Sequence, residues 1–264
     1  MEKGNRYLQI GLVITGVVTV LAVLGLFWTP YDPSAMNSAE MYAAPSLRHL
    51  FGTDNFGRDV FSRVMKGIST TYMISLCTVA LGACVGVIVG ALTGYFGGVV
   101  DEILMRINDA LFAIPSILLA LVVISLLGTG TVNIMIALGV AFIPSFARMI
   151  RAEYIKQKNM DYVLSARLMG ASHFRIMFVH ILPNTLQVLI PSVIIGFNNA
   201  VLAEAGLSYL GIGIQPPDAS LGRMLSEAQS YLFSNPGYAI FPGLMIIMLV
   251  LGLALISEGI QDAS

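Results

Sequence analysis

Long apolar runs separated by short charged segments dominate the hydrophobic pattern of this chain. Leu8–Trp28 contains 21 residues without an ionisable side chain, and a helix needs about 20 such residues to cross a bilayer. Further uncharged runs cover Gly67–Val100, Ala110–Ala147, Leu186–Leu202 and Ala239–Ile256. This pattern predicts an all-α, polytopic membrane protein.

The run Ala110–Ala147 is too long for one span, because it contains 38 residues. It is interrupted by Leu-Gly-Thr-Gly-Thr at 127–131, a combination typical of a turn. We therefore predict two helices of about 18 residues each, joined by this turn. The chain then has six transmembrane helices.

Four glycines in the second predicted span share a four-residue spacing: Gly82, Gly86, Gly90 and Gly94. This spacing places them on one helix face, where the backbone of another helix can approach closely. The pattern predicts a tightly packed helix pair.

Basic residues predict the orientation in the membrane, because Lys and Arg are retained on the cytoplasmic side. With the amino terminus inside, nine of the 14 Lys and Arg residues are cytoplasmic, and six spans place both termini in the cytoplasm. We divide the chain into residues 1–66, with the amino-terminal tail, first span and an extracytoplasmic segment, and a core of five spans at 67–264. A cytoplasmic loop at 148–183 belongs to this core.

Composition excludes several classes of protein. Of the 264 residues, 56% are apolar and only 11% are charged. This share of charged residues is too small to cover the surface of a soluble enzyme. The formal charge of −1 gives no electrostatic reason to expect nucleic-acid binding. The sequence lacks the motifs of zinc proteases, serine hydrolases and P-loop nucleotide binding. The predicted spans carry no Asp, Glu, Lys, Arg or His, unlike most ion-coupled carriers.

Residues that could bind metal are few and scattered. His49 is predicted outside the membrane, whereas His173 and His180 lie inside without a third ligand, so we predict no metal site. Cys77 and Cys84 fall in an apolar run and are predicted to be buried hydrophobic residues.

The cytoplasmic loop contains two short helical stretches that meet at a corner. Asp161–Met169 has helical character, and the chain resumes it from His173. Gly170 can adopt the left-handed conformation that ends a helix, and Ser172 can cap the next one. A rigid bent pair of helices on the inside face is predicted.

This corner and several outer segments resemble a known family. Asp-Tyr-Val-Leu-Ser-Ala-Arg-Leu-Met-Gly-Ala-Ser at 161–172, followed by His-Ile-Leu-Pro-Asn at 180–184, is similar to the cytoplasmic EAA loop of binding-protein-dependent ABC importer permeases. The segments 51–63, 95–98 and 207–217 resemble the dipeptide, oligopeptide and nickel permeases, in particular the second of their two paired subunits. The implied fold is that of a type I ABC importer permease.

The resemblance implies a set of site residues and partners. Ser165, Ala166, Arg167 and Gly170 would be ATPase-coupling residues, while Leu164 stands where the family has Glu. The implied partners are a second homologous permease, two ATP-binding subunits that hold ATP and Mg, an extracytoplasmic solute-binding protein and the bilayer of a bacterial inner membrane. This chain would have no catalytic residue and no cofactor, and its cargo would be a peptide or a nickel or metal chelate.

Three polar residues are candidates for the translocation pathway. Asn198 and Asn199 lie within the fifth predicted span, and Glu204 lies at its outer end. Polar groups in a membrane helix face water or protein, so the two asparagines either line a path or form interhelical hydrogen bonds.

The outer stretch 51–66 alternates apolar and charged residues, which favours an amphipathic helix at the outer interface. Asp59 and Arg63 within it could form an exposed ion pair four residues apart. The rival interpretations of the whole chain are an ATP-independent channel or secondary transporter and a membrane enzyme.

Overall fold

The computed structural model describes residues 2–261, and over this range it contains helices and no β-strand. The transmembrane-length and adjoining helices are α1 (Glu2–Phe27), α2 (Val60–Phe96), α3 (Gly98–Phe112), α4 (Ser116–Leu127), α5 (Thr131–Gln157), α8 (Leu182–Tyr209) and α10 (Gly237–Gln261). The short elements are η1 (Ser38–Glu40), α6 (Asp161–Leu168), α7 (His173–Arg175), η2 (Ile176–Ile181), α9 (Leu221–Ala228) and η3 (Gln229–Tyr231).

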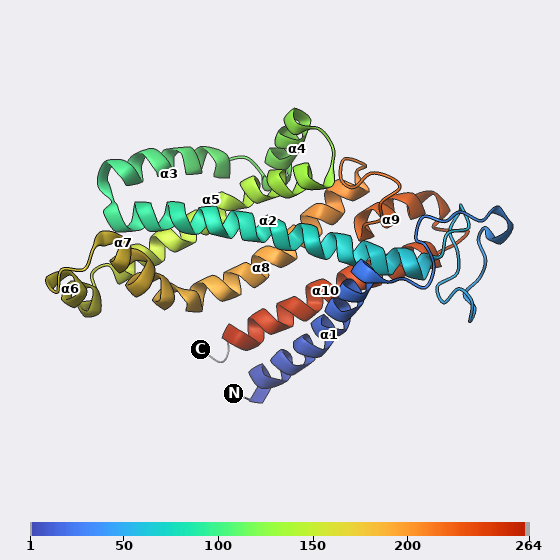
Figure 1. The fold of residues 1–264 in the computed structure, drawn as a ribbon, viewed down its shortest axis with the longest axis horizontal. Helices are drawn as coiled ribbons and strands as arrows, with labels where there is room; N and C mark the ends of the chain where they lie inside the picture. The colour runs from blue at the N-terminus through green and yellow to red at the C-terminus, as the bar shows by residue number, and fades with distance from the viewer. Residues whose placement is uncertain (1, 262–264) are drawn as a thin grey trace.

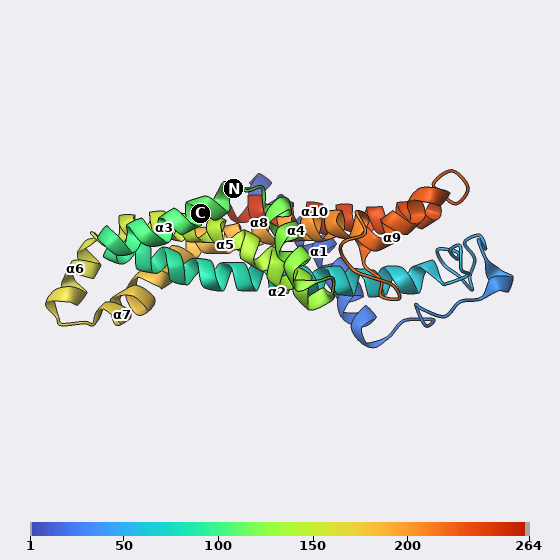
Figure 2. The same ribbon diagram turned by 90° about the horizontal axis from the view of Figure 1, so that it is seen from above.

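The molecule is elongated, with α2 running along most of its length (Figures 1 and 2). The short helices α6 and α7 form one end, and α9 together with the segment 28–59 forms the other. We call these the coupling end and the outer end, after the sequence predictions for the segments that they contain.

Five described helices are long and apolar enough to cross a membrane, and the bent pair α3–α4 makes six if it counts as one span. The third predicted span is therefore wrong as a straight helix: α3 and α4 meet at an angle of 93°. The chain leaves the helix at 113–115 because Pro115 has no amide hydrogen to donate and restricts the residue before it. The predicted turn at 127–131 is confirmed between α4 and α5.

The glycine seam is confirmed. Gly82, Gly86, Gly90 and Gly94 are all buried on α2, and α2 and α5 form the most extensive helix pair. A Cβ at position 86 would lie 2.5 Å from the Cβ of Phe146, and one at position 90 would lie 2.5 Å from the carbonyl oxygen of Ala147. The two backbones can approach this closely only because α2 carries no side chain at these positions.

Helix α1 packs against α10 at the side of the bundle. Gly11 lies where an added Cβ would be 2.7 Å from the carbonyl oxygen of Gly252, so the two helices are in close contact. They run in opposite directions (Figure 1). The ends of α1 and α10 that lead to the chain termini point toward the coupling end (Figure 1). Met1 and residues 262–264 lie outside the described part.

Two predictions about apolar and outer segments are wrong. Cys77 and Cys84 are exposed on the outside of the bundle rather than buried, because the face of α2 that carries them does not pack on α5. Residues 51–59 form turns rather than an interfacial helix, and α2 starts only at Val60. The domain boundary at residue 66 therefore falls inside a continuous helix.

Arg63 and Asp59 are buried instead of forming an exposed pair. The Asp59 carboxylate caps α2 by accepting from the backbone nitrogen of Ser62 at 2.7 Å, and Arg63 turns toward α9. The charged stripe of this segment faces other protein elements, so its periodicity reflects a buried polar interface.

Candidate functional site

The corner between α6 and α7 has a defined hydrogen-bond geometry. Gly170 has φ of +80°; its amide donates to the carbonyl of Arg167, and the amide of Ala171 donates to the carbonyl of Ala166, both at 3.0 Å. These two bonds form a Schellman motif, in which the left-handed residue is normally glycine. The predicted helix stop at Gly170 is confirmed.

The next helix begins as predicted. The Ser172 hydroxyl accepts a hydrogen bond from the backbone nitrogen of Arg175 at 3.3 Å, which caps α7. The chain then passes through η2, a π-helical segment, into α8, where Pro183 occupies the first turn. The corner is thus continuous with a membrane helix.

A second hydrophobic core fixes the corner to the membrane helices. Val163 and Ala166 of α6 are buried against residues of η2 and against α2 and α5; the remaining members of this cluster are Ala91, Tyr95, Ile150, Tyr154, Ile176, Met177 and Ile181. The Tyr154 hydroxyl donates to the carbonyl of Met177 at 2.9 Å. The Tyr95 hydroxyl lies 2.8 Å from Nδ1 of His173. These contacts join five elements, α2, α5, α6, α7 and η2, into one packed unit.

The opposite face of the corner is apolar and exposed. Leu168, Met169 and Phe174 are 89%, 81% and 72% exposed, and Leu164 is exposed as well. We call these four residues the coupling surface. Single exposed apolar residues are common, but four large ones on one short corner are typical of a protein contact site.

The four predicted coupling residues occupy different environments. Ser165, Arg167 and Gly170 are exposed beside the coupling surface, whereas Ala166 is buried in the second core. Ala166 therefore packs inside the corner, whereas the other three residues lie on its surface. Leu164 stands where the EAA loop of importer permeases has Glu, and it extends the apolar surface.

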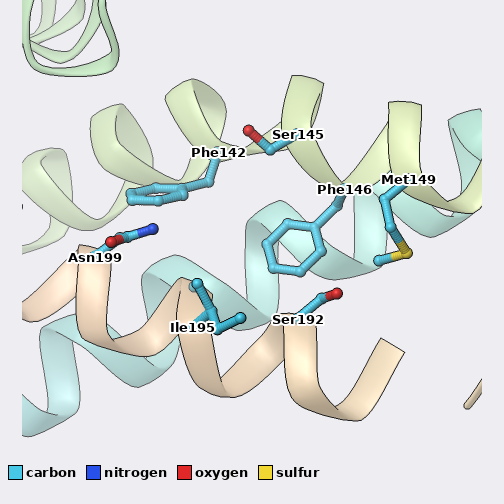
Figure 3. A pocket seen from close by; sticks show the side chains of 8 residues that line it. Phe142, Ser145, Phe146, Met149, Ser192, Ile195 and Asn199 are labelled. Atoms are coloured by element: carbon cyan, nitrogen blue, oxygen red, sulfur yellow. The ribbon is translucent and has the colours of Figure 1, made fainter. Parts of the chain in front are cut away.

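A cavity of about 200 Å³ lies between α5 and α8 (Figure 3). Its lining is apolar apart from two hydroxyls and one amide, and consists of Phe142, Ser145, Phe146, Met149, Ser192, Ile195, Gly196 and Asn199. A neighbouring cavity of about 310 Å³ shares Phe142, Ser145 and Asn199 and reaches Ser116 in the first turn of α4. The bend between α3 and α4 places this turn beside the cavity.

The three predicted pathway residues separate in the structure. Asn199 lines both cavities, whereas the Oδ1 atom of Asn198 is buried without a hydrogen-bond partner among the described residues. Glu204 is fully buried and accepts hydrogen bonds from Thr71 at 2.8 Å and Ser208 at 2.6 Å. Burial of Glu204 in this conformation places it inside a helix junction, so its predicted place on the pathway has no support from its position.

The candidate metal ligands lie apart from one another among the described residues. Among the described residues no group of three or more His, Cys, Asp or Glu side chains could hold a metal ion. Instead, His49 pairs with Asp59 at 2.9 Å through Nδ1, and His173 contacts Tyr95.

A charged cluster at the outer end was not predicted. The Glu227 carboxylate accepts from Arg58 at 2.9 Å and from Arg63 at 3.0 Å, and from the Tyr238 hydroxyl at 2.7 Å. Burial raises the pKa of Glu227, but the charge of Arg63 and the nearby hydrogen bonds outweigh it, so this pKa lies below its ordinary value. The sequence shows the charges of this cluster but not their pairing, because 164 positions separate Arg63 from Glu227.

Comparison with known proteins identifies the class. Residues 86–264 match the model of the family described as binding-protein-dependent transport system inner membrane component. The chain therefore belongs to this family of ABC importer permeases, as the sequence pattern predicted.

Relatives that match over nearly the whole chain are also named as transport permeases. The chain is 38% identical over 267 residues to the dipeptide transport system permease protein DppC of Haemophilus influenzae, covering 99% of this chain and 90% of the relative. It is 37% identical to the glutathione transport system permease protein GsiD of Pectobacterium atrosepticum, with 99% and 89% covered. A putative peptide transport system permease of Brucella abortus is 41% identical, with 98% and 87% covered.

Solved structures share the fold. The chain superimposes on the structure described as inward-facing conformations of the MetNI methionine ABC transporter with a TM-score of 0.61 at 18% identity, covering 76% of this chain and 96% of the other. An amino acid ABC transporter gives 0.59 at 16% identity, covering 76% and 94%. The predicted all-α fold of an importer permease is confirmed, and the chain is the permease of an ATP-driven importer.

Proposed function

We propose that this chain moves peptides across a bacterial inner membrane as one of two paired permeases, driven by ATPase subunits on separate chains. The observation that carries this proposal is the corner of α6 and α7. It exposes an apolar surface of Leu164, Leu168, Met169 and Phe174 on one side and is fixed to α2 and α5 on the other. A soluble motor that grips this surface can rock the membrane helices as rigid bodies.

The coupling residues have distinct roles in this proposal. Gly170 sets the angle between α6 and α7, and Ala166 anchors α6 in the second core. Ser165 and Arg167 are exposed beside the apolar surface and are available to contact an ATP-binding subunit. Leu164 replaces a charged contact with an apolar one, so docking should depend little on salt.

The cargo proposal rests on the cavity between α5 and α8. Its polar groups are the hydroxyls of Ser145 and Ser192 and the amide of Asn199, which can hydrogen-bond peptide amides without selecting a charge. The relatives are named as dipeptide, peptide and glutathione permeases, which favours peptides over nickel or metal chelates. Position favours Asn199 as the pathway residue, because it lines both cavities. Asn198 lines neither cavity, and its Oδ1 has no hydrogen-bond partner among the described residues.

The partners follow from the same arrangement. We propose that residues 67–264 form the transport core with α1 packed beside it. A second homologous permease would close the α5–α8 cavity, and two ATP-binding subunits would hold ATP and Mg. A solute-binding protein would deliver cargo at the outer end, and both termini would be cytoplasmic, on the side of the coupling end.

Reconstitution of the whole importer in vesicles tests this function. Peptide uptake should require ATP and the ATP-binding subunits, and Leu168→Asp should abolish their copurification because a charge would enter an apolar contact. Leu47→Asp is the matched control, since Leu47 is fully exposed in the outer segment. Accumulation of peptide by this chain alone, without ATPase subunits, would contradict the proposal and favour an ATP-independent transporter or channel.

A further inference from the structure

A groove of about 630 Å³ opens at the outer end, between α9 and the segment 31–58. In Figure 2, α9 and this segment lie on opposite sides of the outer end. Asn55 and Arg58 line one wall, and Arg223, Glu227 and Tyr231 line the other. The groove shares no lining residue with the two α5–α8 cavities.

The charged groups beneath the groove do not balance. Three guanidinium groups, those of Arg58, Arg63 and Arg223, face two carboxylates, those of Asp54 and Glu227. Within this ion-paired set the guanidinium groups outnumber the carboxylates by one, and the nearby Asp59 is paired with His49 instead. A positive charge in a partly enclosed groove attracts an anionic group from outside.

The surplus charge is presented by Arg223. Arg58 and Arg63 have side chains 5% and 0% exposed and are held by Asp54 and Glu227, whereas the side chain of Arg223 is 20% exposed. Its contact within the described part of the chain is one bond from Nε to Glu227 at 3.2 Å. The terminal amino groups of Arg223 are left to form a charge-assisted pair with an incoming carboxylate.

Apolar side chains stand at the same groove. Met36 and Phe56 line it and are 65% and 45% exposed. Arginine combined with methionine and aromatic residues is the composition typical of protein contact sites. The site is therefore better suited to a protein loop than to a small ion.

We propose that this groove receives an acidic loop of the extracytoplasmic solute-binding protein, with a carboxylate of that loop paired to Arg223 and apolar neighbours packed on Met36 and Phe56. This inference rests on the proposed function, because it requires the importer to have such a partner. It assigns the groove to docking and leaves the cargo to the α5–α8 cavities.

The test measures binding of the purified solute-binding protein to the complete importer in lipid nanodiscs. Arg223→Gln should raise the dissociation constant roughly tenfold or more and reduce its dependence on salt, while Arg223→Lys should retain most of the binding. Arg106→Gln is the control, since Arg106 is an exposed residue of α3 paired only weakly with Glu102 at 4.0 Å. Only preparations in which the ATPase subunits copurify are compared, which excludes misfolded variants.

Charge reversal gives the second measurement. Arg223→Glu should abolish docking, and replacement of one acidic residue of the solute-binding protein by Lys should restore it. Equal binding by Arg223→Gln and Arg106→Gln would overturn the inference. So would a loss confined to the binding of free peptide, since the groove would then belong to cargo. If even the wild-type importer binds no solute-binding protein, the proposed function itself has failed.

Discussion

The Tyr154 hydroxyl donates to the carbonyl oxygen of Met177 at 2.9 Å, which joins α5 to the segment that leads from the coupling corner into α8. Both residues are buried in the second core. The bond therefore lies on the direct physical connection between the coupling surface and the membrane helices, and it can be removed without a change in ring packing.

We expect Tyr154→Phe to lower the free energy of unfolding by about 1 kcal/mol, because it removes one buried hydrogen bond and keeps the ring. It should also lower peptide uptake per ATP hydrolysed. Tyr162→Phe is the control, since its hydroxyl bonds Gln157 at the surface. Unchanged stability and coupling in Tyr154→Phe would show that the bond does not hold the corner.

Gly170→Val should uncouple ATP turnover from uptake while the membrane subunits still assemble. A left-handed conformation costs a residue with a Cβ about 1–2 kcal/mol, and a β-branched residue tolerates it least. Gly170→Asn should be milder. Gly211→Val is a matched control, because Gly211 has φ of +79° and, like Gly170, open space around an added Cβ. Normal uptake per ATP by Gly170→Val would contradict the proposed role of the corner.

Gly86→Leu should lower the unfolding midpoint, because its Cβ alone would lie 2.5 Å from the Cβ of Phe146. Overpacking of this kind costs about 1–3 kcal/mol or more. Gly16→Leu, where nothing lies within 4 Å of an added Cβ, should fold normally. Thermal unfolding in detergent compares the two, and equal midpoints would refute a close α2–α5 seam.

Glu204→Ala should destabilise the junction of α2 and α8, because Thr71 and Ser208 would lose their hydrogen-bond acceptor. Each buried hydroxyl left unpaired costs about 1–3 kcal/mol. Glu204→Gln keeps one acceptor and the volume of the side chain, so it should lose less. Unfolding measurements that rank the two variants in the reverse order would contradict the role of Glu204 as a hydrogen-bond acceptor for Thr71 and Ser208.

Acid should weaken the outer end. The pKa of Glu227 is lower in the folded chain than in the unfolded chain, so its contribution to stability is present above the unfolded pKa and is lost as pH falls through the folded pKa. We expect the protection of the α9 amides against hydrogen exchange, measured relative to the intrinsic exchange rate at each pH, to fall below about pH 4.5. Glu227→Gln should lose this dependence, whereas Glu102→Gln, at an exposed position, should keep it.

The sequence by itself determined the membrane class, the positions of most spans, the glycine seam and the corner between α6 and α7. Each of these depends on local chemistry: uninterrupted apolar length, a four-residue glycine spacing, and a glycine followed by a serine cap. Gly170 and Ser172 could be placed correctly because the hydrogen bonds that define them join residues at most five positions apart.

Only the tertiary structure decided the 93° bend at Pro115, the burial of Arg63 and Glu204, and the outward position of Cys77. Which face of a helix is buried depends on the neighbour it meets, and a charged residue becomes buried where a distant partner satisfies it. Arg63 finds Glu227 across 164 positions of sequence. No local pattern encodes such a pairing, because it exists only once the chain has folded.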